Sequence, residues 1–236
     1  MIEFKNITKK FNKHYALKNI NLLLKEYQTT VIIGSSGSGK STLLRIINNL
    51  ENPTSGSIFI RGIPLTDKNH YKLCLKIGMV FQQFHLFPHM NILKNLTYAP
   101  QVVFNNPNLI NIKKKAQELL KSFGIEEKLY STPNELSGGE KQKIAICRAL
   151  MMNPNVMLFD EPTSALDPEA IQNIAKIIHK LKSQMTIIIV THQINFAKII
   201  ADRIIFMNKG TIVTDQPAKA FFKNSNSHKA NFFLSV

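Results

Sequence analysis

The segment TVIIGSSGSGKST at residues 30–42 carries the strongest evidence for the fold. Its first four residues are β-branched and are followed by glycine, which is typical of a short buried strand in a parallel sheet. Apolar residues then recur at helical spacing over residues 41–50. Between strand and helix, Gly34 to Ser41 fit the pattern G-x-x-x-x-G-K-[ST]. A strand, a glycine-rich loop and a helix in this order predict a loop that binds polyphosphate.

The residue types of this loop suit a nucleotide. Glycines let backbone N–H groups turn inward without a Cβ clash, and the helix that begins near Lys40 adds the positive end of its dipole. We expect Lys40 on the β- and γ-phosphates of ATP, Ser41 on Mg²⁺ and Thr42 on the α-phosphate. The predicted nucleotide-binding residues of this segment are Gly34, Ser35, Ser36, Gly37, Ser38, Gly39, Lys40, Ser41 and Thr42.

Strand and helix patterns alternate along much of the chain. Residues 77–81, 156–159 and 186–190 read as buried strands, and residues 168–182 and 194–201 read as helices. Such alternation predicts the α/β class, with a mostly parallel sheet covered by helices on both faces. Ligands of these sheets bind at the carboxyl ends of the strands, and the motifs of this chain fall at such ends.

Residues 84–146 have a different character, because strand patterns disappear, prolines cluster and helical stretches such as 112–123 appear. We predict a single domain over residues 1–236, in which a nucleotide-binding core (1–83 and 147–236) carries an inserted helical subdomain (84–146). The tail is expected to dock as a helix through its apolar residues, Phe221, Phe222, Phe232, Phe233 and Leu234.

Residues 156–161 read VMLFDE, four apolar residues followed by two carboxylates. A buried strand that ends in two acids needs compensation, and a metal ion would supply it. Asp160 is a candidate ligand of Mg²⁺, and Glu161 is a candidate base for the water that attacks the γ-phosphate.

A second candidate anion site lies about a hundred residues after the first. Residues 136–140 read LSGGE, in which Ser137 suits a helix N-cap and Gly138 and Gly139 expose the backbone at the positive helix end. One ATP has one γ-phosphate, so two such sites in one chain suggest that two chains share nucleotides.

Together these motifs resemble, over nearly the whole chain, the nucleotide-binding subunit of an ATP-binding-cassette (ABC) transporter. The resemblance implies a P-loop NTPase fold with a RecA-like sheet, an antiparallel edge subdomain and the inserted helical subdomain. Gln82 corresponds to the glutamine that touches Mg²⁺ and meets the membrane subunit, and residues 136–140 correspond to the LSGGQ signature. His192 corresponds to the switch histidine, and Phe11 falls at the aromatic residue that stacks on adenine.

The resemblance also implies a reaction and partners. ATP is hydrolysed with Mg²⁺, with Glu161, His192 and Gln82 as catalytic residues and with Ser41, Gln82 and Asp160 at the metal. Two copies clamp ATP between the loop of one and Ser137, Gly138 and Gly139 of the other. Transmembrane permease subunits are direct partners, and a secreted solute-binding protein is an indirect one.

Within the family, residues 80–90, 133–135 and 161–169 are similar to those of importers of polar amino acids, of the glutamine, arginine and histidine type. Three other functions are alternatives to this reading. They are an ABC ATPase of a non-import membrane complex (lipoprotein release or cell division), a soluble ABC ATPase acting on nucleic acid, and a P-loop kinase or GTPase. The last does not need residues 136–139 and would read guanine with Asn-Lys-x-Asp, which this chain lacks.

The chain departs from the family pattern at a few positions and leaves two assignments open. Glu140 replaces glutamine in the signature, Ser35 stands where proline is common, and Gln193 follows His192 where glutamate is typical. Gln83 is an alternative to Gln82, and Tyr15 is an alternative to Phe11. The other histidines, including His14, have no placement that indicates function.

Composition fits a globular chain, with 44% hydrophobic residues and a net charge of +15. The lysines are scattered without interleaved aromatics, so a solvated surface is favoured over nucleic-acid binding, and attraction to an anionic membrane fits as well. No apolar run is long enough to span a bilayer, and the first residues lack a signal pattern. Cys74 and Cys147 lack metal-ligand spacing. We expect a peripheral protein on the cytoplasmic face of the inner membrane.

Overall fold

The computed structural model describes residues 1–104 and 107–223, and its central element is a six-stranded sheet in the order β10-β9-β3-β8-β7-β6. The pairs from β9 to β6 are parallel, and β10 pairs with β9 antiparallel. This confirms the expected mostly parallel α/β sheet. The strands are β3 (Thr29–Gly34), β6 (Ile77–Val80), β7 (Val156–Asp160), β8 (Thr186–Thr191), β9 (Arg203–Asn208) and β10 (Thr211–Pro217).

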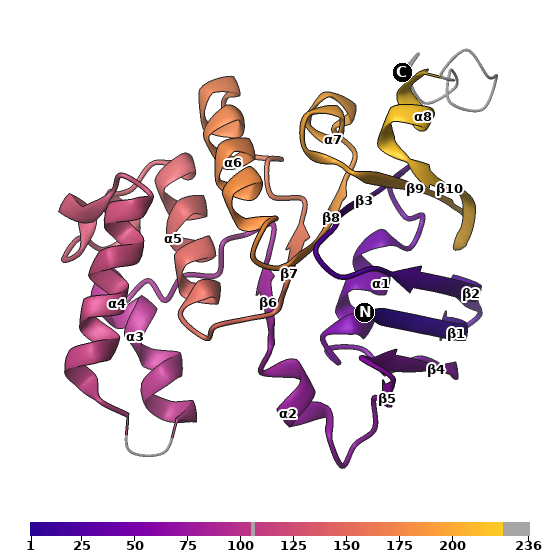
Figure 1. The fold of residues 1–236 in the computed structure, drawn as a ribbon, viewed down its shortest axis with the longest axis horizontal. Helices are drawn as coiled ribbons and strands as arrows, with labels where there is room; N and C mark the ends of the chain where they lie inside the picture. Colours follow the sequence, from indigo (N-terminus) through magenta and orange to yellow (C-terminus); the bar gives the residue numbers. More distant parts are fainter. Residues whose placement is uncertain (105–106, 224–236) are drawn as a thin grey trace.

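A second, antiparallel sheet has four strands in the order β2-β1-β4-β5. It forms the antiparallel edge subdomain that the resemblance implied. Its strands are β1 (Ile2–Phe11), β2 (His14–Leu24), β4 (Ser55–Ile60) and β5 (Ile63–Pro64). In Figure 1 this sheet lies on the opposite side of the molecule from α3, α4 and α5.

The core lies on both faces of the six-stranded sheet because side chains of a strand alternate between its faces. Ile32 of β3 packs with the four-stranded sheet and with α1 (Lys40–Ile47). Its neighbours Val31 and Ile33 point to the other face, where α6 (Pro168–Leu181), α7 (Ile194–Ile200) and α8 (Ala218–Lys223) pack. A strand buried on both faces reads as a continuous apolar run, which is how β3 reads in the sequence.

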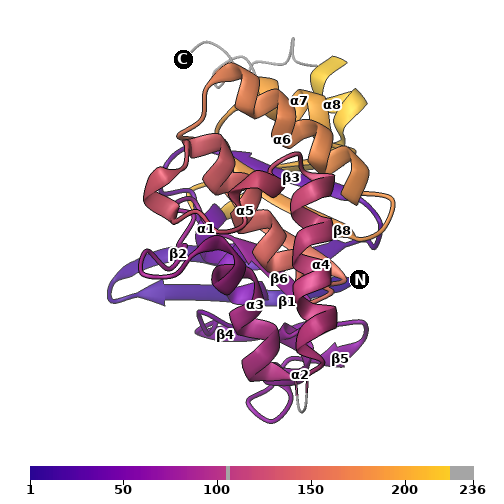
Figure 2. The same ribbon diagram turned by 90° about the vertical axis from the view of Figure 1, so that its left-hand side faces the viewer.

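Three helices form a separate layer, which faces the viewer in Figure 2: α3 (Ile92–Val103), α4 (Leu109–Ser122) and α5 (Gly138–Leu150). They share their own apolar cluster, which includes Leu96, Leu120 and Ile144. The opposite side of α5 contributes Ala145 and Ile146 to the core of the main sheet. Helix α5 therefore joins the two cores, and the predicted boundary at residue 146 lies inside it.

Several elements differ from the sequence reading. The short helix α2 (His70–Cys74) was not predicted, nor was α3, which contains Pro100. In the tail, α8 contacts the core through Phe221 and Phe222, whereas Phe232, Phe233 and Leu234 lie outside the described residues. Over the part of the chain that is described, no helix is long and apolar enough to cross a bilayer.

Candidate nucleotide site

A cavity of about 730 Å³ opens at the carboxyl ends of the parallel strands. The register explains why distant motifs meet there: Ile33 lies beside Thr191, and Asp160 lies beside Val190. The cavity brings together much of the predicted site with two residues that were not predicted. Its lining residues are Phe11, His14, Ala16, Gly34, Ser35, Ser36, Gly37, Ser38, Gly39, Lys40, Ser41, Thr42, Gln82, Glu161 and His192.

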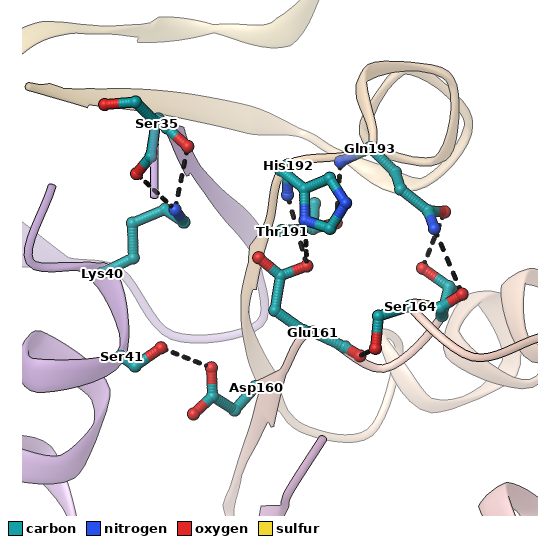
Figure 3. A network of polar contacts seen from close by, with 11 residues as sticks. Ser35, Lys40, Ser41, Asp160, Glu161, Ser164, Thr191, His192 and Gln193 are labelled. Carbon is teal, nitrogen blue, oxygen red and sulfur yellow. Dashed lines mark hydrogen bonds and ion pairs between the residues drawn. The ribbon is translucent and has the colours of Figure 1, made fainter. Parts of the chain in front are cut away.

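Lys40 is buried at the floor of this cavity, with 7% of its surface exposed. Its Nζ donates to the carbonyl oxygens of Gly34 (2.8 Å) and Ser35 (3.0 Å). Figure 3 shows Lys40 pointing toward Ser35 of the loop. Burial lowers the pKa of Lys40, and the nearby carboxylates of Glu161 and Asp160 oppose this shift. A buried ammonium held by carbonyl oxygens on one side can bind a phosphate on the other, and such an anion would favour its charged form.

Ser41, in the first turn of α1, lies beside Asp160, the last residue of β7. The Ser41 hydroxyl donates to Asp160 Oδ1 at 2.7 Å, and Asp160 is 5% exposed. Burial raises the pKa of Asp160, while the Ser41 hydrogen bond and Arg45 lower it. The Asp160 carboxylate and the Ser41 hydroxyl together provide two hard oxygen ligands, of the kind that Mg²⁺ prefers.

Glu161 has a left-handed backbone conformation with φ of 50°, which a glutamate seldom adopts. Its surroundings hold this geometry. The Glu161 N–H donates to the carbonyl of Val190 at 3.0 Å, and the Glu161 carbonyl accepts from Ser164 N at 3.3 Å and Ser164 Oγ at 3.2 Å. The side chain is thereby turned toward His192, whose Nδ1 lies 2.9 Å from Glu161 Oε2.

Gln193 ties the histidine loop to the segment after Glu161. Its Oε1 accepts from Thr163 Oγ1 at 2.9 Å, and its Nε2 donates to the Thr163 carbonyl at 3.1 Å. Thr163 is fully buried. An amide can make both bonds at once because it carries both donors and an acceptor, so the residue that departs from the family pattern links the two loops here.

The lining of the cavity includes Phe11 and His14 but not Tyr15. The Phe11 ring is 43% exposed, and Lys9 Nζ lies 4.7 Å from its centroid. Nothing in the sequence indicated a function for His14, because no residue near it in the chain predicts that it lines this cavity. Its place there follows from the β1–β2 turn, which brings His14 opposite Phe11 in the register of the two strands.

The signature residues lie outside this cavity. Ser137 caps α5, and Ser137, Gly139 and Glu140 line a separate cavity of about 180 Å³ between α5 and α6. The two adjacent glutamines are also distinguished by the main cavity. Gln82 lines it, whereas Gln83 is absent from its lining. The glycine-rich loop and the signature residues of one chain therefore line different cavities.

Gly39 ends the loop and precedes α1 with φ of 102°, a conformation in which glycine is strongly favoured. A Cβ added there would lie 2.4 Å from the carbonyl oxygen of Ala16 and 2.8 Å from Leu17 Cδ2. We expect Gly39→Ala to lower the free energy of unfolding by about 3 kcal/mol or more, measured by urea denaturation without nucleotide.

The matched control for this prediction is Gly124→Ala. Gly124 also has a positive φ (64°), but a Cβ added there meets nothing within 4 Å. The free energy of unfolding of Gly124→Ala should therefore fall by about 1–2 kcal/mol, which is the cost of a left-handed backbone conformation for alanine. Equal losses in the two variants would contradict the close approach of Gly39 to the β2 backbone.

Known proteins resemble this chain over nearly its full length. The family model described as ABC transporter matches residues 17–164. The arginine transport ATP-binding protein ArtM of Bacillus subtilis is 46% identical over 99% of this chain and 98% of its own length. The glutamine transport ATP-binding protein GlnQ of Escherichia coli is also 46% identical, with the same coverage.

Solved structures agree with the sequence relatives. The ATP-binding cassette MJ0796, solved as a dimer in a post-hydrolysis state bound to ADP and Pi, is 39% identical, with a TM-score of 0.84. The match covers 92% of this chain and 99% of that one. Together with the cavity at the strand ends, these matches establish that the chain belongs to the ABC transporter family and is an ATP-binding, ATP-hydrolysing subunit.

Proposed function

We propose that this subunit powers the import of a polar amino acid, such as glutamine or arginine, across a membrane. The observation that carries the proposal is the identity of 43–46% over nearly the whole chain to ATP-binding proteins named for transport of arginine, glutamine, and glutamate/aspartate. The alternatives of lipoprotein release, cell division or action on nucleic acid have no such support among these relatives. Nucleic acid is not a partner in this proposal.

ATP binds in the 730 Å³ cavity with its phosphates in the loop of residues 34–42. Lys40 contacts the β- and γ-phosphates, the loop N–H groups surround them, and Thr42 reaches the α-phosphate. Phe11 stacks on adenine, and His14 borders the base. The shared cavity of Phe11 and the loop supports this placement and favours Phe11 over Tyr15.

The donor set fits Mg²⁺, because the Ser41 hydroxyl and the Asp160 carboxylate are oxygen ligands already 2.7 Å apart, and Gln82 adds an amide oxygen to the same region. Bound there with ATP, Mg²⁺ would neutralise charge on the phosphates. Ser41, Asp160 and Gln82 would hold it there. The burial of Asp160, which raises its pKa, supports a cation at this position.

Hydrolysis requires a base that accepts a proton from the attacking water, and Glu161 takes this role. His192 hydrogen-bonds the γ-phosphate and fixes the Glu161 carboxylate, to which its Nδ1 lies at 2.9 Å. The backbone bonds of Glu161 to Val190 and Ser164 hold the carboxylate so that little reorganisation is needed when the water arrives. Gln82, which lines the same cavity, contacts the γ-phosphate region as well.

Two copies of the chain form the working unit, in which each ATP lies between the loop of one copy and Ser137, Gly138 and Gly139 of the other. The distance in the fold between the two anion-binding features supports this arrangement, since Ser137 does not reach the main cavity of its own chain. The dimer of the related cassette MJ0796 supports it as well. ATP favours the closed dimer, and loss of the γ-phosphate lets it open.

The subunit sits on the cytoplasmic face of the inner membrane, bound to transmembrane permease subunits that receive a secreted solute-binding protein. Residues 84–146 act as a helical subdomain on the core of 1–83 and 147–236. Gln82 and this subdomain pass the closing motion to the permease.

The proposal is tested by purifying the tagged chain from detergent-solubilised membranes and identifying its partners by mass spectrometry. Reconstituted vesicles containing the complex are then assayed for uptake of labelled glutamine and arginine with ATP. We expect a permease partner and uptake of one of these solutes only when ATP and the binding protein are present. Association with a lipoprotein-releasing or division membrane protein, without uptake, would contradict import.

A further inference from the structure

The signature serine is already occupied by a carboxylate of its own helix. Glu140 Oε2 accepts from the Ser137 N–H at 2.8 Å and from Ser137 Oγ at 2.9 Å. The Glu140 N–H donates back to Ser137 Oγ at 3.3 Å, which completes a capping box. A serine hydroxyl has a single proton, so while it serves Glu140 it cannot donate to a phosphate.

The second oxygen of the same carboxylate is paired with Lys128. Glu140 Oε1 lies 3.2 Å from Lys128 Nζ, and the two side chains are 24% and 29% exposed. The hydrogen bond from Ser137 N–H, with further help from Ser137 Oγ and Lys128, holds the pKa of Glu140 below its usual value. The carboxylate is therefore charged at neutral pH, and Lys128 is its salt-bridge partner in the described chain.

The surroundings of this carboxylate are themselves acidic. The 180 Å³ cavity beside the signature is lined by Asp167 and Glu169 as well as Glu140, with Lys143 as the cation among its lining residues. An incoming γ-phosphate therefore meets negative charge as well as the N–H groups of the helix end. Like charges at such close range repel each other even in water.

From these contacts we propose that Glu140 and Lys128 together set how strongly the signature helix accepts the γ-phosphate held by the facing copy. The Glu140 carboxylate competes for the Ser137 hydroxyl and repels the phosphate, and Lys128 limits that repulsion by pairing with it. Both are positioning residues, since Glu140 acts through Ser137 and through its charge, and Lys128 acts through Glu140. The inference rests on the proposed sharing of ATP between two copies.

The test measures ATP-driven dimerisation of the hydrolysis-deficient Glu161→Gln protein by sedimentation velocity over a range of Mg-ATP concentrations. Adding Glu140→Gln removes the charge but keeps a residue that completes the capping box. We expect it to lower the ATP concentration for half-maximal dimerisation by about fivefold. Lys128→Met should raise that concentration by about threefold, and Lys128→Arg should not.

The combined Glu140→Gln and Lys128→Met protein separates this role from a structural one. If Lys128 acts through the carboxylate, its removal has no effect on dimerisation once Glu140 is neutral. Thermal unfolding of each protein, without nucleotide, is the control, and a shift in ATP midpoint without a matching shift in stability supports the inference.

Two outcomes would overturn it, and they are distinguishable. In the first, the Glu161→Gln protein dimerises with ATP, but adding Glu140→Gln leaves the ATP concentration for half-maximal dimerisation unchanged or raises it. This result contradicts the role of Glu140 and leaves the shared-nucleotide arrangement intact. A Glu161→Gln form that stays monomeric at saturating Mg-ATP defeats the shared-nucleotide arrangement, and the inference falls with it.

Discussion

Glu161→Gln should lower the rate of ATP hydrolysis by about 10²- to 10⁴-fold while leaving ATP binding intact. Glutamine has nearly the same shape and can still accept from His192, but it cannot take a proton from water. The γ-phosphate then stays in place, so the closed dimer should accumulate with Mg-ATP. Phosphate release measures the first effect, and size-exclusion chromatography with light scattering measures the second.

Glu118→Gln is the matched control for this change. It removes the same charge from α4, where the Glu118 side chain is 65% exposed and pairs at 4.0 Å with Lys114. It should hydrolyse ATP at the parent rate. If Glu161→Gln also hydrolysed ATP at that rate, the base would have to be another group, and the restrained geometry of Glu161 would need a different explanation.

Lys40→Ala should weaken ATP binding by about 10- to 100-fold, which corresponds to about 1.5–3 kcal/mol. The reason is that Lys40 is a buried cation at the floor of the cavity, anchored by two carbonyl oxygens of the loop. Without it, the phosphates lose charge-assisted hydrogen bonds at a place that water reaches poorly. Isothermal titration calorimetry with the non-hydrolysed analogue AMP-PNP and Mg²⁺ measures the change.

Lys13→Ala tests whether the loss of charge alone explains such an effect. Lys13 is exposed in the turn between Phe11 and His14 and does not line the cavity. Its removal should change the dissociation constant by less than about twofold, because exposed charges are screened. An unchanged ATP affinity in Lys40→Ala would contradict the assignment of the loop as the phosphate site.

The sequence predicted well those features of the fold and the site that depend on residues close together in the chain. The loop after β3 depends on glycines, a lysine and a serine within one segment, and strand β7 carries Asp160 and Glu161 at its own end. A parallel sheet places all such ends at one edge, so Glu161, His192 and the loop could be expected in one cavity before any coordinates. The cap of α5 by Ser137 was equally local.

The parts that escaped prediction depend on contacts between distant segments. His14 reaches the cavity because of the register between β1 and β2, and a single histidine in the sequence gives no sign of that. The sequence left the consequence of the Gln193 departure open, because the two hydrogen bonds of Gln193 with Thr163 exist only where the loop after β8 meets the loop after β7. Helix α3 was obscured by Pro100, whose missing N–H is tolerated within it.

In the proposed dimer, each ATP is bound by the loop of one copy and by Ser137 of the other. A crystal structure of Glu161→Gln with Mg-ATP tests this arrangement most directly. We predict a two-fold dimer in which Ser137 Oγ of one copy lies within hydrogen-bond distance of the γ-phosphate in the cavity of its partner. ATP held in that cavity with every Ser137 far from any γ-phosphate would contradict the account.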